Sequence, residues 1–269
     1  MYDFAVLVTC HLKDKYLERI YDFKNYGLLN IKNVKIKVFF LCGSEQPPVD
    51  LRENCPYEVQ FVNSERFYDG PKLYDFVAKL DLEEVKKYRW WLKVDDDSIS
   101  DVSVLLQKLD EEFDWERAEY IFGDYGGGTW PIFEEAIKQT KHVHKFFYPN
   151  TLDKQIFHHE FESCVISSAC MQKIIQDEEC IKLLKILSEP KNDTQGNVHD
   201  QGLAIAARFV KVHGSTSLFM TSTPNLKNFS LFGGRFAHIH FIHRRSPEWP
   251  IFLAKLHQKM LVFGWNVYE

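Results

Sequence analysis

The sequence predicts an α/β protein with a mostly parallel central sheet flanked by helices. Three short runs, at 4–9 (FAVLVT), 37–42 (KVFFLC) and 89–94 (RWWLKV), are mainly apolar and have the length of strands buried on both faces. Segments with a helical spacing of apolar residues lie between them, at 14–25 and from position 69 onward. This alternation of strand and helix is typical of parallel sheets with crossover helices.

Local signals set the limits of these elements. Leu17 and Ile20 lie on one face of the first predicted helix, and Gly27 is placed to end it. Residues 57–62 alternate apolar and polar side chains, which predicts a strand with one wetter face. Pro71 occupies the favoured first position of the next predicted helix. Strand ends after 9, 43, 62 and 94 are therefore expected to share one edge of the sheet.

The second half of the chain carries weaker signals. Asp101 can cap a helix, and three glycines at 126–128 predict a flexible loop. Asp200 begins the predicted helix DQGLAIAARF. The remaining elements are expected as strands at 120–122 and 163–167, a helix from 169, a mobile loop at 190–197 and a terminal helix over about 249–260.

Composition describes an ordinary globular protein. The chain has 269 residues, of which 45% are hydrophobic and 26% charged, so a disordered chain is excluded. A net charge of −5 gives no clear signal for nucleic-acid binding. The 15% of aromatic residues is high, and most of them are expected in the core. Six cysteines without a CxxC pair, no signal peptide and no membrane-spanning run predict a cytoplasmic protein.

Three adjacent carboxylates, Asp95, Asp96 and Asp97, directly follow the third apolar run. Adjacent carboxylates repel one another unless solvent or a cation screens them. In extended backbone Asp95 and Asp97 point to the same side, so both can converge on one hard cation such as Mn²⁺ or Mg²⁺. The alternative is a solvated acidic turn that caps the next helix.

The segment YRWWLKVDDDSISDVSVLLQKLD resembles the core motif of GT-A glycosyltransferases, most closely glycosyltransferase family 31 and the Fringe-type enzymes. FYDGPKLYDFVAKL, YIFGDY, ESCVISSACMQKI and VHDQGLAIAARF resemble further segments of these enzymes in the same order. The resemblance implies a GT-A fold and a Mn²⁺ or similar ion carried by the diphosphate of a nucleotide sugar. HDQG and the pair His240-Phe241 also resemble retaining family 8 enzymes.

The resemblance implies roles for the acidic triplet and its partners. Asp97 would bind the metal directly, Asp95 would contact the donor ribose or a metal-bound water, and Asp96 would face the floor of the site or help hold the donor sugar. A histidine near the carboxyl terminus often completes such a site, and His240 is the first candidate, with His238 as the second. Asp200 would be the base that deprotonates the acceptor hydroxyl in an inverting transfer, or a residue that orients substrate in a retaining one.

Further contacts are expected at two places. Thr9 and His11, after the first strand, and Lys72, at a helix start, are candidates for donor binding. Trp130 could stack on an acceptor sugar, and Glu162 could bind its hydroxyl groups.

The expected enzyme is a hexosyltransferase that moves a sugar from a nucleotide diphosphate sugar, with uridine diphosphate (UDP) as the expected nucleotide, to an acceptor hydroxyl. It would form a single GT-A domain, with a donor half over about 1–125 and an acceptor half over about 126–269. The terminal helix could contact a membrane surface. The alternatives are a metal-dependent phosphoryl-transfer enzyme or hydrolase, and a sugar- or metal-binding module. Neither a P-loop nor a GxSxG motif occurs in the sequence.

Overall fold

Strand β1 (Tyr2–Thr9) lies between β3 (Ile36–Cys42) and β5 (Tyr88–Asp95) in the main sheet. The computed structural model describes residues 1–12, 16–43, 47–53, 55–64, 69–122, 127–128, 157–158, 163–188, 203, 206, 210, 213–216, 220–221 and 238–240. All three strands are almost fully buried, because they have neighbours on both edges and helices on both faces.

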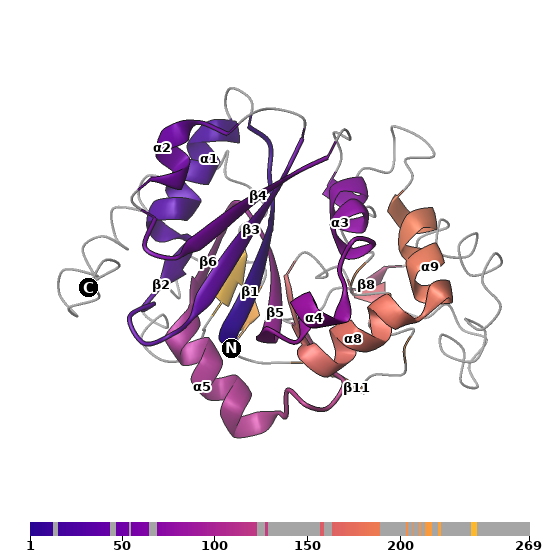
Figure 1. Ribbon diagram of the computed structural model, residues 1–269. Coiled ribbons are helices and arrows are strands. Elements are labelled where there is room, and N and C mark those ends of the chain that lie inside the picture. The colour runs from indigo at the N-terminus through magenta and orange to yellow at the C-terminus, as the bar shows by residue number, and fades with distance from the viewer. Residues whose placement is uncertain are drawn as a thin grey trace.

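The main sheet has seven strands in the order β11-β7-β10-β5-β1-β3-β4. Strands β4, β3, β1 and β5 are parallel. Strand β10 is antiparallel to both of its neighbours, so β7 and β11 again run in the direction of β5. The predicted α/β class with a mainly parallel sheet is confirmed (Figure 1). The other four strands of this sheet are β4 (Glu58–Asn63), β7 (Glu119–Phe122), β10 (Cys164–Ser167) and β11 (His213–Thr216).

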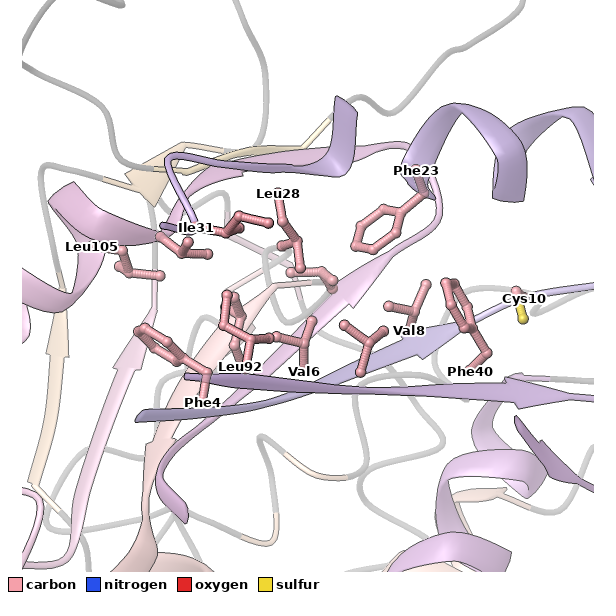
Figure 2. Packing of buried hydrophobic residues seen from close by; sticks show 14 of the residues in the cluster. Phe4, Val6, Val8, Cys10, Phe23, Leu28, Ile31, Phe40, Leu92 and Leu105 are labelled. Atoms are coloured by element: carbon pink, nitrogen blue, oxygen red, sulfur yellow. The ribbon is translucent and has the colours of Figure 1, made fainter. Parts of the chain in front are cut away.

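Helices cover both faces of this sheet (Figure 1). On one face Phe4, Val6 and Val8 of β1 point toward Phe23 and Leu28 (Figure 2). That face is covered by α1 (Leu17–Asp22), the π-helix η2 (Phe23–Gly27) and α5 (Val102–Glu112). The opposite face is covered by α3 (Asp69–Val77), α4 (Leu82–Val85), α8 (Ser168–Gln176) and α9 (Glu178–Ser188).

Two smaller sheets join segments that are distant in sequence. One has the order β12-β13-β6-β2, and the other pairs β8 with β9. The first sheet therefore attaches residues 238–240 to the segment that follows the aspartate triplet. The strands are β2 (Leu28–Leu29), β6 (Ser98–Asp101), β8 (Gly127–Gly128), β9 (Phe157–His158), β12 (Met220–Thr221) and β13 (His238–His240), and the short helix α2 spans Val49–Arg52.

Most predicted elements are present, with three corrections. Helix α3 begins at Asp69, so Pro71 is not at its first position. Gly127 and Gly128, predicted within a flexible loop, instead pair with residues 157–158, which lie some thirty positions away. The first helix does end at Gly27, but its last part is the π-helix η2. A Cβ atom at Gly27 would overlap the ring of Phe23, so the close approach of that ring explains the glycine.

Several sequence-based expectations lie outside the described residues: the loop at 190–197, Asp200 and the terminal helix. All six cysteines are free thiols, and Cys10 and Cys42 are buried as expected. Within the part of the chain that the structure describes, no helix is long and apolar enough to cross a membrane.

Asp101 caps α5, as the sequence predicts. Its carboxylate accepts hydrogen bonds from the Val104 amide at 3.1 Å and from the Asn30 side chain at 2.7 Å. Burial nevertheless raises the pKa of Asp101, although these hydrogen bonds act in the opposite direction. Folding therefore favours the protonated carboxyl, so the native Asp101 contributes less stability as the pH rises through its raised pKa.

We expect Asp101→Ala to lower the free energy of unfolding by about 1–2 kcal/mol, because the cap is lost. Asp101→Asn retains a capping oxygen and does not ionise. Its stability relative to the native protein should therefore increase as the pH rises from about 4, the usual carboxyl range, toward 7. Urea unfolding at several pH values measures both effects. If the difference in stability between Asp101→Asn and the native protein did not change with pH, the raised pKa of Asp101 would be contradicted.

Candidate active site

The aspartate triplet lies at the carboxyl end of β5. Asp95 is the last residue of the strand, and Asp96 and Asp97 form the turn into β6. Asp96 and Asp97 are only 7% and 8% exposed, and the cap of α5 is Asp101. Burial of this extent argues against the solvated, helix-capping turn, because buried carboxylates are costly unless other groups compensate their charge.

Asp95 is held by two donors on one oxygen. Lys93 Nζ donates to Asp95 Oδ1 at 2.8 Å, and Thr9 Oγ1 donates to the same atom at 3.0 Å. The parallel register of β1 and β5 places Thr9 directly beside Asp95. Lys93 precedes Asp95 by two positions and therefore lies on the same face of β5. Strand pairing alone thus brings these three side chains together.

Asp96 has a basic neighbour from another element. Arg19 Nη1, on helix α1, lies 3.5 Å from Asp96 Oδ1. The Arg19 side chain is 25% exposed, and its guanidinium also lies over the Tyr16 ring at 5.3 Å. Two of the three carboxylates are consequently close to a cation supplied by the protein itself, which reduces the repulsion between them.

The three residues predicted to bind the donor are brought to the same edge. Lys72 is 1% exposed; its Nζ donates to the Cys10 carbonyl at 2.7 Å and lies 3.2 Å from His11 Nδ1. Cys10 and His11 directly follow Thr9, which donates a hydrogen bond to Asp95. Lys72 therefore holds the end of β1 in place, and donor contact by these residues remains a prediction.

The predicted histidines are in strand β13. This strand is antiparallel to β6, with His240 opposite Ser98 and His238 opposite Ser100. Since Ser98 follows Asp97 directly, the backbone of His240 is the nearer of the two to the triplet. The register thus favours the first of the two candidate histidines.

Carboxylates at a strand end fit a hard divalent cation. Among the described residues, no three histidine, cysteine or acidic side chains are grouped closely enough to form a complete metal site. Mg²⁺-type ions in phosphate-transfer sites, however, require only one or two protein carboxylates, with substrate phosphates as further ligands. The triplet satisfies that smaller requirement.

Thiol chemistry is disfavoured at this edge. Burial holds the pKa of Cys10 well above its usual value, and it raises the pKa of Cys164, the neighbour of Lys93 on β10, to about 12. Both thiols are therefore protonated at neutral pH and are poor nucleophiles.

The sequence missed two site residues. Lys93 was visible only as part of the strand before the triplet, although its spacing from Asp95 places both on one face. Arg19 carried no local signal, because its contact with Asp96 depends on the packing of α1. Asp200, Trp130 and Glu162 lie outside the described residues.

No protein-family model and no curated protein matches the sequence. Among solved structures, a galactosyltransferase, LgtC, in complex with donor and acceptor sugar analogues, is similar over 89% of this chain and 87% of its own, with 12% sequence identity and a TM-score of 0.48.

The hydrogen bond from Lys72 to the Cys10 carbonyl is expected to stabilise the folded protein. Lys72→Met preserves the apolar part of the side chain but leaves the buried Cys10 carbonyl without this donor. We expect the free energy of unfolding to fall by about 1–3 kcal/mol. Urea denaturation measures the change.

Lys79→Met is the matched control, since Lys79 is exposed just beyond the end of the same helix. It should leave stability within about 0.5 kcal/mol of the native value. Equal stabilities for the two variants would show that the Lys72 contact does not support the end of β1.

Proposed function

We propose that this chain is a metal-dependent glycosyltransferase that moves a sugar from a nucleotide diphosphate sugar to an acceptor hydroxyl. The observation that carries the proposal is the buried aspartate triplet at the end of β5, with Asp95 fixed by Lys93 and Thr9. Carboxylates in this position are suited to a hard cation and its phosphate ligands.

The location supports ligand binding. Ligands of parallel α/β sheets bind beyond the carboxyl ends of the strands. Strands β1, β3, β4 and β5 are parallel and end at one edge, where Thr9, His11 and Asp95 lie. We propose that Thr9, His11 and Lys72 contact the nucleotide part of the donor, most simply a UDP-sugar.

The edge contains groups of both signs, as a metal-bound diphosphate requires. Asp97 would bind Mn²⁺ or Mg²⁺, with His240 as a further ligand and Asp95 on the ribose or a metal-bound water. The ion would supply charge neutralisation for the departing diphosphate. The chain's own basic groups at this edge, Lys93 and Arg19, lie beside Asp95 and Asp96.

For the transfer step we propose an inverting displacement. Asp200 would accept the proton of the acceptor hydroxyl while the acceptor oxygen bonds to the sugar's anomeric carbon and the bond from that carbon to the diphosphate breaks. Trp130 and Glu162 would contact the acceptor. A retaining enzyme related to family 8 would need no dedicated base, and Asp200 would then orient the substrate.

We further propose that the chain works as one catalytic unit in the cytoplasm, with a donor half over about 1–125 and an acceptor half over about 126–269. Strands β10 and β13 of the second half pair with β5 and β6 of the first, which supports a single unit. The apolar residues of the terminal segment would suit contact with a membrane surface that carries the acceptor.

Donor binding provides the first test. UDP with Mn²⁺ should raise the melting temperature of the native protein by several degrees, because a ligand at a hundred times its Kd stabilises by about 2.7 kcal/mol. Asp97→Asn, which retains the shape of the side chain, should abolish this shift, whereas Glu112→Ala on the exposed end of α5 should preserve it. No shift with any nucleoside diphosphate and metal would refute the proposal and favour a hydrolase or a binding module.

The second test separates binding from chemistry. Asp200→Asn should preserve the thermal shift with UDP and Mn²⁺ but reduce transfer by about 10²–10⁴-fold, because the proton acceptor is lost. Mass spectrometry of products formed from a panel of nucleotide sugars measures turnover and identifies the donor. Undiminished turnover would reject Asp200 as the base.

A further inference from the structure

Lys93 is an unusual residue for its position. It lies in β5 between Leu7 of β1 and Cys164 of β10, so neither of its neighbours on the adjacent strands is charged. Its side chain is 1% exposed. A charged group this deeply buried is rare unless it is paired, since losing its hydration is costly. An apolar side chain would fill the same place without that cost.

The partner of Lys93 is Asp95, and the geometry of the pair is specific. Lys93 Nζ and Thr9 Oγ1 both donate to Asp95 Oδ1, at 2.8 and 3.0 Å. They approach from two different strands, so their bonds together oppose rotation of the carboxylate about its χ angles. The Asp95 side chain is 21% exposed, which leaves it accessible at the edge where the donor is expected.

We propose that Lys93 is a positioning residue that fixes the Asp95 carboxylate for binding of a metal-bound nucleoside diphosphate. The inference rests on the proposed function. Lys93 Nζ donates to the Asp95 carboxylate, as Thr9 Oγ1 does, so Lys93 acts on the ligand through Asp95. Outer partners of this kind typically change metal or ligand affinity by about 10–100-fold when they are removed.

The test is a double-mutant cycle on Lys93 and Asp95, measured as the Kd for UDP in saturating Mn²⁺ by calorimetry. Lys93→Met should weaken binding by about 10–100-fold. Asp95→Ala, which removes the carboxylate itself, should weaken it at least as much. Because Lys93 is proposed to act through the Asp95 carboxylate, the double variant should bind about as weakly as Asp95→Ala alone, rather than with the product of the two losses.

Lys37→Met is the matched control. Lys37 also lies on a strand of the sheet and pairs with a carboxylate, Glu58, at 3.2 Å, but it lies toward the opposite end of the strands. It should leave the Kd unchanged. Thermal melting without ligand shows whether each variant is folded, and Lys93→Gln replaces Lys93→Met if the latter does not fold.

The outcomes distinguish the two proposals. If the native protein binds UDP with Mn²⁺ and the two losses are not multiplicative, positioning by Lys93 is supported. If the native protein binds but Lys93→Met has no effect, or the losses multiply, the positioning role is wrong and the glycosyltransferase proposal stands. If the native protein does not bind, both proposals are overturned.

Discussion

The parallel pairing of β1 with β5 is the constraint on which the candidate site depends. Both strands are packed on both faces, and their register places Thr9 beside Asp95. A slip of one residue would turn Thr9 to the opposite face of the sheet and place Phe4 and Val6 on the wrong side. The packing that stabilises the two core clusters therefore also sets the hydrogen bond between Thr9 and Asp95. The register of β1 and β5 therefore determines both the packing of the core and the arrangement of the candidate site.

Burial of charge at the end of β5 is costly, and the compensating groups come from several elements. Lys93 comes from β5 itself, Thr9 from β1 and Arg19 from α1. Stability alone would be served as well by apolar side chains, because buried ion pairs seldom stabilise a fold more than good packing does. This arrangement lies at the carboxyl ends of parallel strands, where ligands of such sheets generally bind, and it is therefore better explained by function.

The sequence predicted the inner strands because strands buried on both faces have a strong local signal, as in residues 4–9 and 37–42. The reversed direction of β10 could not be predicted, since strand order depends on contacts between distant segments. Helix α9 was missed for a local reason. Only Asp177 separates it from α8, so the sequence contains no loop that would mark the boundary between the two helices. The Asp177 carboxylate caps α9 by accepting hydrogen bonds from the Glu179 and Cys180 amides.

The candidate site shows the same difference between features with a local sequence signal and features that depend on contacts between distant segments. The triplet was recognisable because its three carboxylates are adjacent, whereas the roles of Lys93 and Arg19 depend on burial and on packing between elements. The chain's net charge of −5 is likewise a poor guide to its ligand, because the local charges decide recognition. At this edge Lys93 lies beside Asp95 and Arg19 beside Asp96, so the edge is far closer to neutral than the triplet alone suggests. A cation bound to a diphosphate also carries both signs, and a mixed edge of this kind can accommodate its two parts together.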